Sequence, residues 1–184
     1  MKNVLIAGAA ILLYSSSANA QSESVAGKDE KEIRQEIKKS DKELKLQNMP
    51  PTYQSVQAFI RDFPGSENVS WKVSPYFEEA TYTSNGVTMT AYYDQDNELV
   101  GTTTEKSFDD IPVKAKNFIS KHYSGYTPFE VILFDDNEDN TTDMTLYNTV
   151  FDDEDNYFVL VKNSNETLVL KSNANGDVSF FKRL

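Results

Sequence analysis

The stretch VQAFIRDFPGSENVSWKV, residues 56–73, constrains the fold most, because a helix pattern stops there and a strand pattern begins at once. The Pro64-Gly65 pair ends the helix, since proline cannot donate a helical backbone hydrogen bond. Alternation around Trp71, the only tryptophan, predicts a strand, and we expect the ring of Trp71 to lie in the core. Thr52 is placed to cap the helix. The apolar residues of the helix recur at i, i+3, i+4 and i+7 and so share one face: Val56, Phe59, Ile60 and Phe63.

A second helix pattern repeats this plan further along the chain. Asp109 or Asp110 is expected to cap it, and Pro112 to occupy its first turn. By this equivalence His122, the only histidine, takes the core-facing position of Phe63, where an imidazole at a helix end meets the carbonyl dipole. We therefore interpret His122 as structural. The apolar stripe has the spacing of the first helix: Ala115, Phe118, Ile119 and His122.

Short strand patterns separated by turn residues follow each helix. The first set, at 68–73, 76–83, 87–94 and 98–105, alternates between an apolar face and a Thr-rich face that we expect to be exposed. The second set is expected at 129–134, 142–151, 157–162, 166–171 and 177–183. Residues 131–134 and 157–161 are apolar on both faces, which predicts central strands. The sequence thus predicts an α+β fold of tandem helix-plus-antiparallel-sheet repeats, with the helices packed on one face of the sheet.

Three segments are expected along the chain. Residues 1–20 have the features of a secretory signal peptide, with Lys2, a short apolar run and a small-residue cleavage pattern at 18–20. Residues 21–51 form a charged arm, helical or disordered, that buries little. Residues 52–184 form the domain, with repeats at 52–106 and 107–184. We expect cleavage after Ala20 and a periplasmic or secreted protein that does not insert into the membrane.

Charge limits the partners. The chain carries 18 basic and 29 acidic residues, and removal of residues 1–20, with one lysine and no acid, changes the net charge from -11 to -12. A field of this sign repels nucleic acid and favours a protein partner with a basic surface. No cysteine is present, so neither a disulfide nor a lipid-modified cysteine contributes.

The order of the motifs resembles a known family. A helix ending in AFxxxFP, the strand VSWKV, the segment AYYDQDNELVG and a second unit opening with DIPxxxxxFIxxxYxGY are similar to PepSY-like, beta-lactamase-inhibitor-like periplasmic proteins of Bacteroidetes, over about residues 53–184. The resemblance implies tandem helix-plus-sheet repeats, export, no catalytic apparatus and a binding role. The matching positions are Ala58, Phe59, Phe63, Pro64, Val69, Trp71, Ala91, Tyr93, Asp94, Ile111, Pro112, Phe118, Ile119, Tyr123, Gly125 and Tyr126.

Catalytic chemistry has few candidates in this sequence. Without cysteine and with one histidine, a Cys/His pair and a histidine-rich zinc site are excluded, and a serine triad would require His122. Carboxylates are abundant, but none stands out as a paired acid and base. We expect no cofactor and no catalytic residue. An enzyme that uses only carboxylates for catalysis stays open as one further hypothesis, besides the two binding functions considered below.

The acidic stretch at 135–140 has part of the ligand spacing of a calcium loop. Asp135, Asn137 and Asp139 match the first three ligand positions of an EF-hand, but Asn140 replaces the glycine and Leu146 replaces the final glutamate. A solvated hairpin tip is the better interpretation, with these three as weak calcium candidates and no metal predicted. A weaker site remains open if the acidic turn at 152–155 folds close to it.

The predicted binding residues lie on the strand face opposite the core. They are Phe77 and Tyr92, with Tyr147 in the second half, together with Asp152 and Asp153 in an acidic turn. Exposed tyrosine among threonine hydroxyls is suited to an interface, because tyrosine brings contact area with few rotatable bonds. The first hypothesis is an exported, non-catalytic module that binds a protein, as an inhibitor or modulator of a hydrolase. The alternative is a carbohydrate- or peptide-binding module that uses the same face.

Overall fold

The computed structural model describes residues 49–184 throughout, and of the preceding chain only residues 35, 38, 39, 42, 45 and 46, which are helical. The expected signal peptide at 1–20 and most of the charged arm at 21–51 therefore lie outside the described residues. Within the part that is described, the helices are too short and too polar to cross a bilayer.

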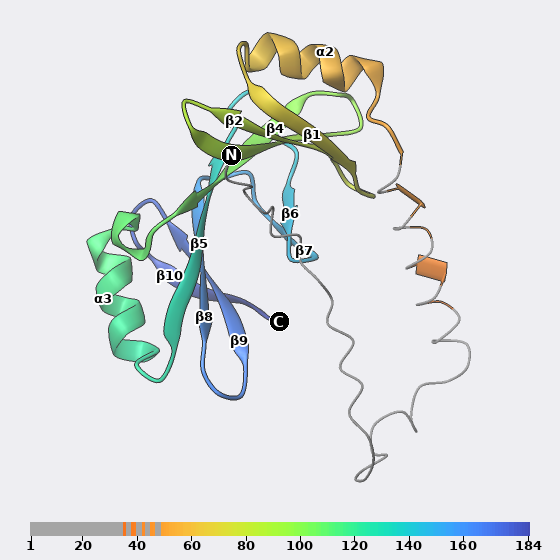
Figure 1. The fold of residues 1–184 in the computed structure, drawn as a ribbon. Helices are drawn as coiled ribbons and strands as arrows, with labels where there is room; N and C mark the ends of the chain where they lie inside the picture. The colour runs from red at the N-terminus through yellow and green to blue at the C-terminus, as the bar shows by residue number, and fades with distance from the viewer. Residues whose placement is uncertain (1–34, 36–37, 40–41, 43–44, 47–48) are drawn as a thin grey trace, which may run out of the picture. The chain divides into compact units, whose positions relative to one another are not determined.

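An open, eight-stranded antiparallel sheet forms the body of the described domain (Figure 1). Its order, β1-β2-β3-β4-β5-β8-β9-β10, follows the chain, so that each strand pairs with the one before it except where a small hairpin of β6 and β7 is inserted. The strands are β1 (Glu67–Val73), β2 (Glu78–Ser84), β3 (Val87–Tyr93), β4 (Leu99–Lys106), β5 (Thr127–Asp136), β6 (Met144–Leu146), β7 (Thr149–Phe151), β8 (Asn156–Lys162), β9 (Thr167–Asn173) and β10 (Val178–Arg183).

Helix α2 (Tyr53–Asp62) packs on the first half of the sheet. As predicted, the Thr52 hydroxyl caps it by accepting from the Ser55 N–H at 3.1 Å. Phe59 is buried, and Trp71 of β1, half-buried, meets it edge-on with ring centroids 5.6 Å apart. Ile60, expected on the apolar stripe, is 56% exposed. The cluster beneath the helix comprises Ala58, Phe59, Ala80, Tyr82, Ala91 and Tyr93.

Helix α3 (Val113–His122) begins and faces differently from the prediction. Asp110 does not cap it but accepts from the Ser107 N–H at 2.7 Å in a separate 3-10 turn, η1 (Phe108–Asp110), and Pro112 occupies the N-cap position. His122 is exposed, so its expected core position is wrong. Its ring instead stacks on that of Phe118, with centroids 4.3 Å apart.

The predicted alignment of α3 with α2 is wrong by one residue. Ala115 and Ile119 are the buried residues of α3, and the Tyr123 N–H bonds to the Ile119 carbonyl at 2.8 Å. The Phe63 N–H bonds in the same way to the Phe59 carbonyl at 2.9 Å. Tyr123, and not His122, therefore corresponds to Phe63, because the helix must end before the chain turns into the next strand.

The central strands are apolar on both faces, as predicted. In β8 the alternate residues Phe158 and Leu160 belong to one buried cluster, and Val159 and Val161 to another, which lies under α3. The latter cluster contains Ala115 and Ile119 with Val131, Leu168 and Leu170. The architecture is thus mostly sheet, with α2 and α3 on an open antiparallel sheet in the part described. That the two halves are tandem repeats, and that both helices share one face, stay predictions.

The single strand expected at 142–151 is wrong, because the chain reverses in its middle. Tyr147 and Asn148 have φ of 52° and 56°, and Leu146 pairs with Thr149 across this two-residue turn. Turns of this kind require positive φ at both central positions, which glycine and asparagine adopt most readily. The turn was not predicted from the sequence, because its first central residue is Tyr147 and not glycine or asparagine.

Candidate functional site

A hollow opens where the end of β1, the loop that follows it and the turn between β6 and β7 meet. We call it the sheet-face hollow; its volume is about 360 Å³. It lies on the side of β2 that carries Glu79, opposite Ala80 and the cluster under α2, because successive strand residues point to opposite faces. Its lining includes Lys72, Tyr76, Phe77, Glu79, Tyr92 and Tyr147.

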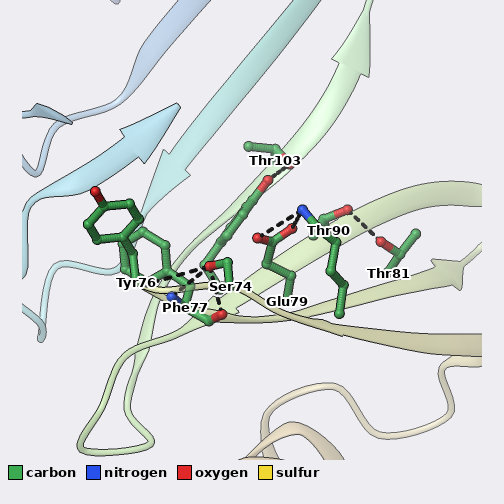
Figure 2. A network of polar contacts seen from close by, with 9 residues as sticks. Ser74, Tyr76, Phe77, Glu79, Thr81, Thr90 and Thr103 are labelled. Carbon is green, nitrogen blue, oxygen red and sulfur yellow. Dashed lines mark hydrogen bonds and ion pairs between the residues drawn. The ribbon is translucent and has the colours of Figure 1, made fainter. Parts of the chain in front are cut away.

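A serine turn holds the exposed aromatic ring at its rim (Figure 2). The Ser74 hydroxyl accepts from the Phe77 N–H at 2.9 Å and donates to the Phe77 carbonyl at 2.9 Å, and the Ser74 N–H donates to the same carbonyl at 2.8 Å. These bonds fix the backbone around Tyr76, whose side chain is 52% exposed. Tyr76 is therefore an aromatic contact group on a preorganised loop.

Polar pairs cross the strands beside the hollow. Lys72 of β1 forms an ion pair with Glu79 of β2 at 3.1 Å, and the Thr81 and Thr90 hydroxyls lie 3.0 Å apart. The threonine contact, which Figure 2 shows with Glu79 beside it, continues the polar row across β2 and β3. This face of the first strands is therefore lined with hydroxyl and charged groups whose partners are already in place.

Tyr92 is the buried hydroxyl of this face. Its hydroxyl lies 3.0 Å from the Thr103 hydroxyl. Burial, aided by the negative charge of Glu79, raises the pKa of Tyr92 to about 12, although the bond to Thr103 lowers it. Tyr92 thus remains a neutral phenol at physiological pH and serves as a hydrogen-bonding group, not as an anion.

The structure brings Phe77, Tyr92 and Tyr147 to one hollow, but not as exposed residues. Phe77 is 6% and Tyr92 is 9% exposed, so their expected exposure is wrong. The β6–β7 hairpin covers this face, and its Phe151 ring meets those of Phe134, Phe158 and Phe181 at centroid distances of 5.2, 4.8 and 5.9 Å. The β6–β7 hairpin, which lies far from Phe77 and Tyr92 in the sequence, thus buries a part of the sheet face that was expected to be exposed to solvent.

Tyr147, half-buried, packs against the same cluster. Its hydroxyl has no hydrogen-bond partner among the described residues, and burial raises its pKa. Lys182 of β10 donates to the Tyr147 carbonyl and so ties the turn to the last strand.

Sequence reasoning missed Lys72, Ser74, Tyr76 and Glu79. Two signals in the sequence could have found them. The Ser74-Pro75 pair marks a tight connection whose next residue is aromatic, and Lys72 and Glu79 are opposite charges that each lie two residues outside the connection 74–77.

Acidic turns gather at the end of the sheet where β3, β5 and β8 meet their loops. The Asp94 carboxylate accepts from the Asn140 amide at 3.0 Å, from the Thr142 hydroxyl at 3.2 Å and from the backbone N–H groups of Asp96 and Glu98 at 2.9 and 3.0 Å. Burial opposes ionisation, but these bonds outweigh it and lower the pKa of Asp94. Asp94 thereby fastens the β5–β6 loop to the β3–β4 turn.

The turn at 152–155 folds onto the end of β5. The Asp155 carboxylate accepts from the Asp136 N–H at 2.9 Å. Burial and then the negative charge of Asp153 raise the pKa of Asp136 to about 6. Asp152 is exposed and Asp153 half-exposed in this turn. These two predicted binding residues therefore lie at the acidic end of the sheet.

The weak calcium candidates take separate roles. The Asn137 amide donates to the Leu99 carbonyl at 2.6 Å, while Asp139 is exposed and Asp135 lies within β5. Within the described residues, no three His, Cys, Asp or Glu side chains form a group that could hold a metal ion.

Comparison with known proteins finds solved structures of the same fold. A scan against protein-family models gave no match, and a search of curated proteins gave none either. Among solved structures, a DUF2874 family protein from Bacteroides uniformis has a TM-score of 0.60 at 16% identity, over 73% of this chain and 90% of its own. A BLIP-like protein from Bacteroides fragilis has a TM-score of 0.57 at 16% identity, over 74% and 88%.

A third neighbour is a candidate periplasmic protein from Bacteroides eggerthii, with a TM-score of 0.59 at 15% identity, over 73% of this chain and 90% of that one. At such identities the likeness is one of fold. It supports the beta-lactamase-inhibitor-like part of the expected resemblance; the PepSY-like part is not shown.

Proposed function

We propose that this protein is an exported, non-catalytic module that binds a protein partner with a basic surface, through the sheet-face hollow and the acidic turns. The observation that carries the proposal is the hollow itself, where exposed Tyr76 stands on a hydrogen-bonded loop beside Lys72 and Glu79. The fold neighbours, which include a BLIP-like protein and a candidate periplasmic protein, support a module of this class.

The size and chemistry of the hollow suit one or two inserted side chains. About 360 Å³ lies at the lower end of the range for small-molecule sites, and protein interfaces use such hollows to receive a central anchor residue. Tyr76 offers aromatic area to a partner at low cost in conformational entropy. A hydrolase as the partner, inhibited or modulated, is the form of this proposal that the BLIP-like neighbour favours.

Charge supports the basic partner. Residues 49–184 hold 22 of the 29 acidic residues and 10 of the 18 basic ones, so the described domain alone carries a net charge of -12. Complementary charge speeds encounter and selects against acidic competitors, and its effect weakens as salt rises.

Capture of the partner from a periplasmic extract by crosslinking tests the proposal. The purified domain should retain a saturable protein that is lost at high salt and lost with Tyr76→Ala. The matched control is Tyr53→Ala, which removes another exposed tyrosine, 74% exposed against 52% for Tyr76, from α2. Tyr92→Ala is unsuitable, because it would open a cavity in the core. Retention that is equal in both variants would contradict a role for the hollow.

The hydroxyls of Thr81 and Thr90 and the exposed ring of Tyr76 favour a second candidate, a carbohydrate- or peptide-binding module on the same face. Binding of glycans or short peptides without any retained protein would select it. Turnover of hydrolase substrates by the purified chain would overturn the non-catalytic assignment. Export itself is tested by N-terminal sequencing of the exported protein, which should begin after Ala20.

A further inference from the structure

Two buried oxygen atoms at the acidic end of the sheet have no hydrogen-bond partner among the described residues. They are Oδ1 of Asp136 and Oδ1 of Asn156. The Asn156 side chain is fully buried, at 0% exposure, and its Nδ2 donates to the Glu154 carbonyl at 2.9 Å, which identifies the free atom as the oxygen. Buried acceptors without a donor are costly and rare, so this pair points to a bound ion or water.

The two oxygens belong to neighbouring positions on adjacent strands. Asn156, at the start of β8, pairs with Phe134 of β5, and Asp136 lies two residues beyond Phe134 on the same face. Diagonal neighbours of this kind are about 7 Å apart at the backbone, within reach of one shared ion. The bond from the Asp136 N–H to Asp155, at 2.9 Å, holds the turn at 152–155 against them.

The charge around the pair calls for a cation. Residues 135–155 include nine aspartates and glutamates and no lysine or arginine. Asp153, Glu138 and Asp155 each place negative charge near Asp136. The Asn156 side chain is buried, and its amide donates to the Glu154 carbonyl of this acidic turn, so the indication of a ligand does not come from the acids alone.

The donor types identify the ion. Carboxylate, amide and carbonyl oxygens together are the ligands of a hard cation, and calcium accepts such mixed, irregular sets with water completing the shell. In the described part no three His, Cys, Asp or Glu side chains converge on a metal position, so an amide oxygen has to complete the set of ligands. We propose that one calcium ion binds between β5 and the turn at 152–155, with Oδ1 of Asp136, Oδ1 of Asn156 and the carboxylate of Asp153 as ligands.

This site replaces the set Asp135, Asn137 and Asp139 suggested by the sequence. The open condition of that prediction, that the second acidic turn should fold close, is met by the bond between Asp136 and Asp155. Three protein ligands make a weak site, of the order of 10⁻⁴ to 10⁻³ M as in extracellular calcium modules.

Thermal unfolding of the EDTA-treated chain tests the site, with calcium chloride titrated at constant ionic strength. The Tm should rise saturably with a midpoint in the range of about 10⁻⁴ to 10⁻³ M. Asp153→Asn, in an accessible turn, should shift that midpoint at least about tenfold, and Asp136→Asn should abolish the rise. The matched control is Asp139→Asn, which removes one exposed charge from the nearby β5–β6 loop and should leave the titration unchanged.

Three results would overturn the proposal: no rise in Tm up to 10-fold above the expected range, an equal Tm in sodium chloride of the same ionic strength without calcium, or an equal loss in the Asp139→Asn control. A larger response to magnesium than to calcium would also overturn it, because magnesium requires a regular octahedral shell. Calorimetric titration of the unmodified chain with calcium gives a second readout that does not depend on how the variants fold. The outcome is separate from partner capture through Tyr76.

Discussion

Gly101 shows how closely one residue can be specified by its neighbours. It lies in β4 opposite Asp136, and a Cβ atom there would stand 2.6 Å from the Asp135 carbonyl and 2.7 Å from the Phe134 ring. Real Cβ atoms do not come so close, and both neighbours are held in the sheet. A side chain at this position must therefore displace backbone.

We predict that Gly101→Ala destabilises the domain by about 1–3 kcal/mol, the usual cost of overpacking a well-filled site. Urea unfolding followed by Trp71 fluorescence measures it. Gly125→Ala is the control, because a Cβ at Gly125 meets no atom within 4 Å. If the two substitutions cost the same, the close contact at Gly101 is not what constrains it.

The carboxyl group of Asp94 is expected to make the stability of the domain depend on pH. Its pKa is lowered in the folded state by bonds from Asn140, Thr142 and two backbone N–H groups. A carboxyl with a depressed folded pKa stabilises the protein above its unfolded pKa, near 4, and that stabilisation is lost as pH falls through the folded pKa.

Asp94→Ala should therefore lower the urea midpoint clearly at pH 7 and much less at pH 3. The comparison of the variant with the unmodified chain at each pH isolates this group from the other acids. A loss of equal size at both values would show that the side chain acts by packing and not by its charge.

At the scale of the element, α3 gives the clearest test of which face is buried. Ile119 is 2% exposed in the cluster under α3, whereas His122 is exposed beside Phe118. Ile119→Ala should destabilise the domain by about 2–5 kcal/mol, and His122→Ala by less than about 0.5 kcal/mol. Chemical denaturation measures both, and a large loss for His122→Ala would restore the core position that the sequence suggested.

The β6–β7 turn stores local strain at Asn148, where φ is 56°. Asparagine tolerates this conformation, glycine adopts it freely, and alanine pays about 1 kcal/mol or more. Asn148→Gly should thus be at least as stable as the unmodified chain, and Asn148→Ala less stable than Asn148→Gly by about 1 kcal/mol. Thermal unfolding of the two variants decides, and equal stabilities would mean that the turn relaxes to another type.

At the scale of the whole molecule, self-repulsion opposes folding, since the domain carries a net charge of -12 with its acids crowded at one end. Salt screens such repulsion over distances of about 10 Å at 0.1 M. Raising sodium chloride from about 0.01 M to 0.2 M in EDTA should therefore raise the urea midpoint. A midpoint that falls with salt would mean that the ion pairs, such as Lys72 with Glu79, outweigh the repulsion.

The sequence by itself determined the elements that local physics controls. Thr52 caps α2 as predicted, and the runs at 131–134 and 157–161 became central strands, because capping and period-two burial depend on neighbours close in the chain. Because β8 is apolar on both faces, other parts of the chain had to pack on both of its sides.

Only the tertiary structure decided which face stayed open. The burial of Phe77 and Tyr92 depends on the β6–β7 hairpin, whose turn at Tyr147-Asn148 carries no glycine to announce it. Likewise, only the pairing of β5 with β8 brings Asp136 beside Asn156. Alternation along a strand tells which residues share a face, but what covers that face is a long-range contact that no local pattern contains.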